Sequence, residues 1–239
     1  MEDTIKIKNL IKNYGNFQAV SDVSFCAKKG EILGIIGPNG AGKTTILRII
    51  STLLKPTSGI VEVFGFDVVK YANKAREKIS YLAEESGSYK NLSGKRYFEF
   101  IAGFYSENEK ERNKIVESGI KIAKLGKKIE NKAESYSKGM SRRLLLARSL
   151  MINPEIAILD EPTSGLDVLN AREIRQVIKE FAIKGKTVLL SSHNMLEVDF
   201  LCDRIILIQK GKLVEEGSPK DLKKKYKAAN IEEVFEKAI

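Results

Sequence analysis

The sequence predicts an α/β fold with a mostly parallel sheet, an N-terminal antiparallel β subdomain and an inserted helical subdomain. Continuous apolar runs at 31–36, 156–159 and 187–190 are typical of strands that are buried on both faces of a parallel sheet. Residues 5–10 instead alternate apolar and polar side chains, as a half-buried strand does. From about residue 88 to 152, charged helical patterns replace strand patterns and indicate the insertion.

The composition is that of a globular protein. Of the 239 residues, 43% are hydrophobic and 30% are charged, which is enough chain and apolar surface for a substantial core. No apolar run approaches the roughly 18 residues that a membrane-spanning helix needs. Two cysteines cannot provide a disulfide framework in a chain of this length. Membrane-spanning and disulfide-stapled classes are therefore not expected.

The net charge of +10 has two interpretations. One is an anionic partner, such as a nucleic acid or a membrane surface. The other is a solvated surface rich in lysine and glutamate, of the kind common in heat-adapted proteins. Charge is the only feature that favours the first, so we expect no nucleic-acid partner.

The remaining elements follow from the same patterns in chain order. Residues 23–27 predict a second N-terminal strand, and the apolar positions of 46–50 predict a helix directly after the strand at 31–36. A short strand is enclosed by the glycines at 59 and 65. In the second half, a helix at 170–182 separates two buried strands, and 205–214 predicts a hairpin that turns at Lys210-Gly211. Two short amphipathic helices follow, at 219–226 and 231–238.

A phosphate-binding loop lies between the third strand and the first helix. It reads Gly37-Pro38-Asn39-Gly40-Ala41-Gly42-Lys43-Thr44-Thr45 and fits the pattern G-x-x-x-x-G-K-[ST]. Glycines let the backbone N–H groups curl around phosphate oxygens, and the helix N-terminus attracts the same anion. Lys43 is expected to reach the β- and γ-phosphates, and the Thr44 hydroxyl to bind Mg²⁺. The alternative, a glycine-rich turn without a ligand, does not explain the strand and helix on either side. The loop therefore predicts a phosphate-loop NTPase core.

Two acidic residues follow the buried strand at 156–159. Asp160 is placed to hold Mg²⁺ through water. Glu161 is predicted to point to the other face of the strand and to act as general base on an attacking water. The loop and the acidic pair together predict a nucleoside triphosphate and Mg²⁺ as the ligands, and they leave kinases, GTPases and helicases open.

A third motif narrows the class of phosphate-loop protein. The segment Tyr136-Ser137-Lys138-Gly139-Met140 opens a helical pattern and resembles the LSGGQ signature of ABC ATPases. The resemblance implies that Ser137, Gly139 and Met140 face the γ-phosphate of an ATP held by a second copy of the domain. A helix cap followed by a solvated basic stretch is the alternative for this motif taken alone.

Other elements of that family occur in the expected order. Asp167 ends a segment that resembles the D-loop, His193 follows a core strand where the family has its switch histidine, and Tyr14 matches the aromatic that stacks on adenine. Glu84 stands where the family has its Q-loop glutamine, and its carboxylate can still reach Mg²⁺. The resemblance implies an ABC ATPase domain at 1–218, with the helical subdomain at 88–152, and a helical tail at 219–239.

The resemblance also implies a function. Together with the tail sequence at 230–235, the signature resembles the branch that serves exporters of drugs, ions or polymers. We therefore expect an ATP-hydrolysing subunit that powers a separate transmembrane permease from the cytoplasmic face of the membrane. A non-transport ABC ATPase, acting in metal-cluster assembly or on nucleic acid, is the alternative.

Two partners are expected. One is a second ABC ATPase subunit, with a homodimer favoured over a heterodimer because one chain carries both half-sites. The other is the permease, docked in a groove between the core and the helical insertion. Six residues near 84–104 could line that groove or pack the helical subdomain instead: Tyr89, Leu92, Tyr97, Phe98, Phe100 and Phe104.

Overall fold

A central six-stranded sheet organises the molecule. The computed structural model describes residues 2–239 and orders these strands β10-β9-β3-β8-β7-β6. Every pair is parallel except β9 with β10, so the prediction of a mostly parallel sheet is confirmed. The strands span β3 (Ile32–Ile36), β6 (Ile79–Leu82), β7 (Ile156–Leu159), β8 (Thr187–Ser192), β9 (Arg204–Gln209) and β10 (Lys212–Gly217).

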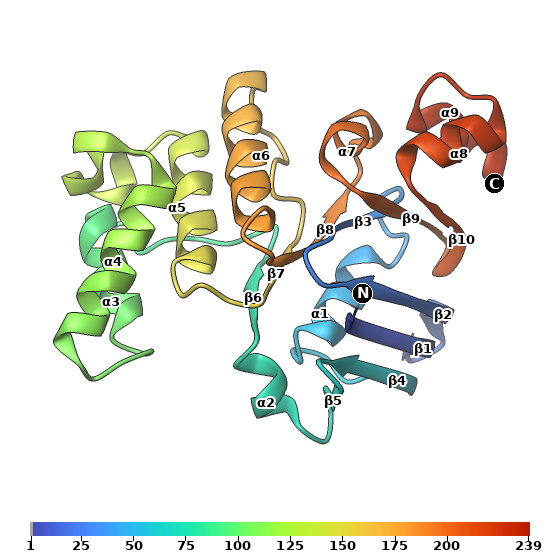
Figure 1. The fold of residues 1–239 in the computed structure, drawn as a ribbon, viewed down its shortest axis with the longest axis horizontal. Coiled ribbons are helices and arrows are strands. Elements are labelled where there is room, and N and C mark those ends of the chain that lie inside the picture. Colours follow the sequence, from blue (N-terminus) through green and yellow to red (C-terminus); the bar gives the residue numbers. More distant parts are fainter. Residues whose placement is uncertain (1) are drawn as a thin grey trace.

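A separate antiparallel sheet lies at the N-terminal side (Figure 1). Its order is β2-β1-β4-β5, and its strands are β1 (Asp3–Tyr14), β2 (Phe17–Lys28), β4 (Ser58–Val63) and β5 (Phe66–Asp67). β1 and β2 are longer than the sequence pattern predicts because bulges let each strand continue through polar positions. This sheet confirms the predicted antiparallel β subdomain.

Two apolar cores lie on opposite faces of the central sheet. Alternate residues of β3 face opposite ways, so Leu33 and Ile35 join one core while Ile32 and Ile36 join the other. The first core includes α1 (Lys43–Ile50) and the antiparallel sheet. The second core includes the helices of the other face. Burial on both faces explains why β3 has no polar position.

In chain order the helical insertion follows β6 and precedes β7, and its helices lie together to one side of the central sheet (Figure 1, left). Side chains of Ser93, Asn108 and Ser137 cap its three α-helices at their N-termini. The elements are α3 (Gly94–Ala102), α4 (Glu109–Ala123), the 3-10 helices η1 (Gly126–Glu130) and η2 (Ala133–Ser135), and α5 (Lys138–Leu150). Phe98 is fully buried among them.

The C-terminal half completes the second core. It contains α6 (Val168–Ala182), α7 (Met195–Leu201), α8 (Pro219–Tyr226) and α9 (Ile231–Ala238). Leu222, Ile231 and Val234 bury the tail helices against the domain, and Lys223 pairs with Asp199 of α7 at 2.7 Å. Within residues 2–239, no helix combines the length and the apolar character that crossing a bilayer requires.

Candidate active site

The phosphate loop turns sharply between β3 and α1. Gly42 has φ +106°, and a Cβ at this position would lie 2.5 Å from the carbonyl oxygen of Ala19. Only glycine fits both the backbone angle and the close approach. The loop therefore delivers the chain directly into the first turn of α1, where the backbone N–H groups and the helix dipole favour an anion.

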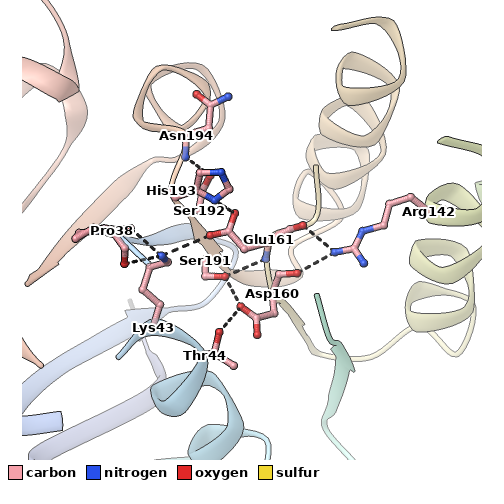
Figure 2. Close-up of polar contacts among 11 residues, drawn as sticks. Pro38, Lys43, Thr44, Arg142, Asp160, Glu161, Ser191, Ser192, His193 and Asn194 are labelled. Carbon is pink, nitrogen blue, oxygen red and sulfur yellow. Dashed lines mark hydrogen bonds and ion pairs between the residues drawn. The ribbon is translucent and has the colours of Figure 1, made fainter. Parts of the chain in front are cut away.

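Lys43 is a buried cation over this loop (Figure 2). Its Nζ donates hydrogen bonds to the carbonyl oxygens of Gly37 at 2.7 Å and Pro38 at 3.1 Å. It also lies 3.5 Å from Oε1 of Glu161. A buried ammonium held by neutral carbonyls keeps its positive charge available for a phosphate group.

Asp160 is buried where three hydroxyl groups converge. Its Oδ1 accepts hydrogen bonds from Thr44 at 3.1 Å and Ser191 at 2.6 Å, and its Oδ2 accepts one from Tyr81 at 3.2 Å. Burial of the Tyr81 phenol, reinforced by the negative charge of Asp160, raises the pKa of Tyr81 to about 12. Tyr81 is therefore a neutral donor at physiological pH, and its hydroxyl helps to fix the orientation of the Asp160 side chain.

Glu161 diverges from Asp160 because of its backbone conformation. β7 ends at Leu159, and Glu161 has φ +47°, a left-handed conformation that costs about 1–2 kcal/mol for a residue with a side chain. The expectation that strand alternation would direct Glu161 away from Asp160 was wrong, because Glu161 lies beyond the end of β7 and its left-handed backbone sets the direction of its side chain. The carboxylate of Glu161 lies with Oε2 2.9 Å from Nδ1 of His193, while its buried Oε1 accepts no hydrogen bond.

The hydroxyl of Thr44 and the carboxylate of Asp160 could bind a magnesium ion together with the phosphates of a nucleotide. One hydroxyl and one carboxylate lie within 3.1 Å of each other at the start of α1. The described residues 2–239 hold no cluster of three or more acidic, histidine or cysteine side chains suited to a metal. Mg²⁺ is commonly held by one or two carboxylates with substrate phosphates and water rather than by an all-protein cage, so the donor set fits.

A cavity of about 370 Å³ brings most of the predicted nucleotide residues together. Tyr14 and Glu84 line it beside Lys43, Thr44 and Glu161. The side chain of Tyr14 is 46% exposed, which leaves its ring accessible to a ligand. The cavity is also lined by Phe17, Ala19, Asn39, Gly40, Ala41, Gly42 and Thr45.

The residues of the signature motif lie elsewhere. Ser137 caps α5 and accepts a hydrogen bond from the backbone N–H of Met140 at 3.2 Å. A Cβ on Gly139 would lie 2.3 Å from the side chain of Asn170, which in turn donates to Asp167 at the start of α6. Among the residues that line the phosphate-loop cavity, Ser137, Gly139, Met140 and Asp167 do not occur. Gly139 and Met140 are buried, Met140 in the second core, so only Ser137 and Asp167 of this group are exposed, and they lie outside the phosphate-loop cavity.

Three residues of the site have no signal in the sequence. Ser191 donates to Asp160 and accepts from the backbone N–H of Glu161 at 2.9 Å, and Tyr81 fixes the other oxygen of Asp160. Arg142 on α5 binds backbone carbonyls next to both acidic residues. Each of the three contacts an acidic residue that lies at least 18 residues away in the sequence, so no local motif predicts the contact.

The fold and the site together define a phosphate-loop nucleotide-binding protein with an acidic residue positioned for hydrolysis. Residues 20–164 match the family model for the ABC transporter. The chain belongs to the ABC transporter family.

Relatives in the family agree with this assignment. The chain is 39% identical over 93% of its length to the probable multidrug ABC transporter ATP-binding protein YbhF of Escherichia coli, and spans only 38% of that protein. It is 35% identical over its full length to the daunorubicin resistance ATP-binding protein DrrA3 of Streptomyces coeruleorubidus, of which it covers 76%.

Solved structures show the same fold. A dimeric ATP-binding cassette, MJ0796, in a post-hydrolysis state with ADP and Pi is 29% identical, with a TM-score of 0.80 over 90% of this chain and 98% of that one. CbiO1 of Clostridium perfringens, part of the ABC transporter complex CbiONQ, is 26% identical, with a TM-score of 0.83 over 93% and 91%.

Proposed function

We propose that two copies of this chain bind and hydrolyse Mg-ATP at shared sites and thereby drive a separate transmembrane permease, most directly for export. The observation that carries the hydrolytic part is the arrangement around Glu161. Its buried Oε1 accepts no hydrogen bond and faces the Lys43 ammonium at 3.5 Å, while His193 contacts Oε2. A carboxylate with one unoccupied buried oxygen can accept a proton from a water molecule.

In the proposed reaction, the phosphate loop and Lys43 hold the β- and γ-phosphates of ATP. Glu161 takes a proton from a water as the water oxygen attacks the γ-phosphorus, and the bond to the β-γ bridging oxygen breaks to release ADP and phosphate. His193 orients the carboxylate through its 2.9 Å contact. Tyr14 supplies an exposed ring against which the adenine can stack.

Mg²⁺ is assigned to Thr44, Asp160 and Glu84. The hydroxyl of Thr44 and the carboxylate of Asp160 converge within 3.1 Å, and the side chain of Glu84 lines the same cavity. When bound there, the ion neutralises negative charge on the phosphates. Ser191 and Tyr81 keep Asp160 oriented toward that position.

A second copy of the chain supplies the other half of each site. The separation of Ser137, Gly139, Met140 and Asp167 from the phosphate-loop cavity supports a site that two chains complete. The signature serine already caps a helix whose N-terminus attracts anions. Because each chain holds one phosphate loop and one signature, a symmetric homodimer is favoured over a heterodimer.

The permease is assigned to a groove between the core and the helical insertion. This groove, of about 450 Å³, is lined by β6, α5 and the segment after α3, and the buried Oγ of Ser80 beside it has no hydrogen-bond partner. Of the six predicted aromatic and apolar residues, Tyr97 and Phe98 pack the helical subdomain. Tyr89, Phe100 and Phe104 are exposed. Their rings pack edge to face, Tyr89 against Phe100 and Phe100 against Phe104. A permease docked here would hold the chain at the cytoplasmic face of the membrane.

Export is supported by the relatives, which carry multidrug and daunorubicin-resistance names.

The test of the hydrolytic role is Glu161→Gln. It keeps the size of the side chain but cannot accept a proton, so steady-state release of phosphate from Mg-ATP should fall by roughly 10²–10⁴-fold while ATP binding persists.

The matched control is Glu155→Gln, which changes a glutamate at the opposite end of β7, where it pairs with Lys186 at 2.8 Å. This variant should hydrolyse ATP within about twofold of the unmodified chain, as the partly exposed Glu155 lies away from the phosphate loop and a partly exposed ion pair contributes little. Unchanged turnover in Glu161→Gln would refute the assignment of the base.

A further inference from the structure

Arg142, on α5, donates hydrogen bonds from its guanidinium to backbone carbonyls, including those of Asp160 and Glu161 (Figure 2). Its side chain donates five hydrogen bonds, which equals the number of N–H groups on a guanidinium. The acceptors are the carbonyl oxygens of Ala83, Glu84, Asp160, Glu161 and Pro162, at distances between 2.8 and 3.1 Å. Arg142 is 8% exposed, so these bonds are shielded from water.

The surroundings keep this guanidinium charged. Burial lowers the pKa of Arg142, and the nearby carboxylates of Glu84, Asp160 and Glu161 oppose that shift. The group nevertheless forms its hydrogen bonds with main-chain atoms rather than with those carboxylates. It therefore fixes the path of the backbone after β6 and after β7 and leaves the acidic side chains available.

The backbone that Arg142 holds is strained at one residue. Glu161 has φ +47°, a conformation that persists only where the surrounding structure fixes it. Nη2 of Arg142 binds the carbonyls of Asp160 and Glu161 at 2.8 Å, and Ser191 binds the N–H of Glu161. The direction of the Glu161 carboxylate follows from this conformation.

The same helix begins at the signature motif. Ser137 caps α5, and Arg142 follows five residues later, about 7.5 Å along the helix axis. A packed helix moves as a rigid unit over this distance. A displacement at the N-terminus of α5 therefore reaches the carbonyls beside Glu161 through the guanidinium.

We propose that Arg142 is a positioning residue that links the signature end of α5, which faces the partner's ATP, to the general base of its own chain. This rests on the proposed function of Glu161 and Ser137. Binding of ATP across the dimer would thereby set the backbone of Glu161 and couple hydrolysis at one site to occupancy of the other.

The test uses Arg142→Lys in the full chain, since lysine keeps the charge but cannot bridge five carbonyls. We expect kcat for ATP hydrolysis to fall at least tenfold, the Kd for Mg-ATP to stay within twofold, and the Hill coefficient to move toward one. Arg143→Lys is the control, because Arg143 on the same helix pairs instead with the exposed Glu173 of α6 and with the carbonyl of Lys124, and it should leave all three values unchanged.

Chemical rescue separates positioning from general stability. Arg142→Ala opens space beside a cavity of about 300 Å³ that Arg142 itself lines. Low-millimolar guanidinium chloride, far below denaturing concentration, should restore several-fold of the lost kcat. Urea, which has a similar shape without the charge, should restore none. Equal recovery with urea, or no recovery with guanidinium, would overturn the proposal.

A double variant distinguishes this proposal from the proposed function. If Arg142 acts through Glu161, Arg142→Lys should slow single-turnover hydrolysis by less than twofold in the Glu161→Gln background. A full tenfold loss there would overturn the proposal, as would a wild-type kcat or a parallel loss of ATP affinity in Arg142→Lys alone. Retained turnover in Glu161→Gln alone would instead refute the proposed base, and with it the role of Arg142.

Discussion

Lys43 is the residue on which phosphate binding depends most directly. Its ammonium is buried, held by the carbonyls of Gly37 and Pro38, and aimed into the cavity of the phosphate loop. Lys43→Ala removes the only charged group of the loop, so the affinity for Mg-ATP should fall at least tenfold, about 1.4 kcal/mol. Equilibrium titration with a fluorescent ATP analogue measures this change.

The control for that titration is Lys95→Ala, which removes an exposed lysine paired with Glu130 at 3.7 Å on the helical insertion. It should leave the affinity unchanged. Equal affinities in the Lys43 and Lys95 variants would show that the loop is not the phosphate site.

At this scale, local motifs point to the residues proposed to bind the nucleotide, but not to the residues that orient them. The phosphate loop, Asp160 and Glu161 are contiguous in sequence with the strands that present them, so spacing is informative. Arg142 is one of 41 basic residues, and only the packing of α5 against the ends of β6 and β7 gives it a role. Nothing in its neighbours distinguishes it from Arg143.

Helix α3 has two faces with different roles. Phe98 is fully buried in the helical insertion, whereas Phe100 is 45% exposed beside the proposed permease groove. Phe98→Ala should lower the free energy of unfolding by about 3–5 kcal/mol because it leaves a cavity. Phe100→Ala should change it by about 0.5 kcal/mol or less. Denaturant titration of both variants measures the contrast.

Association with the permease should depend on the exposed Phe100 rather than on the buried Phe98. In membranes that contain the permease, Phe100→Ala should reduce salt-resistant association of the chain, since aromatic side chains dominate many interfaces. Normal association of this variant, or a loss of stability as large as that of Phe98→Ala, would contradict the assignment of the groove.

Element prediction was most accurate where apolar runs were long. β3, β7, β8 and the hairpin of β9 and β10 occur where continuous or alternating patterns place them. β5, α2 (Ala72–Arg76), β6 and α7 were not predicted, because these short elements lack the continuous apolar run that marks β3 and β7. β6, for example, carries Ser80 in a strand of four residues.

At the scale of the whole molecule, the groups proposed to bind and hydrolyse ATP lie on two separate surfaces. One contains the phosphate loop with Asp160 and Glu161, and the other contains the start of α5 with the signature serine. The proposed function therefore has two chains completing each site, each contributing one surface to each nucleotide.

The most direct test is the mass of Glu161→Gln, measured by size-exclusion chromatography with light scattering, with and without Mg-ATP. This variant should retain ATP and elute as a dimer with nucleotide and as a monomer without it. Adding Ser137→Asp keeps an N-cap residue on α5 but places a negative charge against the γ-phosphate, so the double variant should stay monomeric with ATP. A monomer under both conditions for Glu161→Gln, or an ATP-dependent dimer that Ser137→Asp does not disrupt, would contradict the shared site.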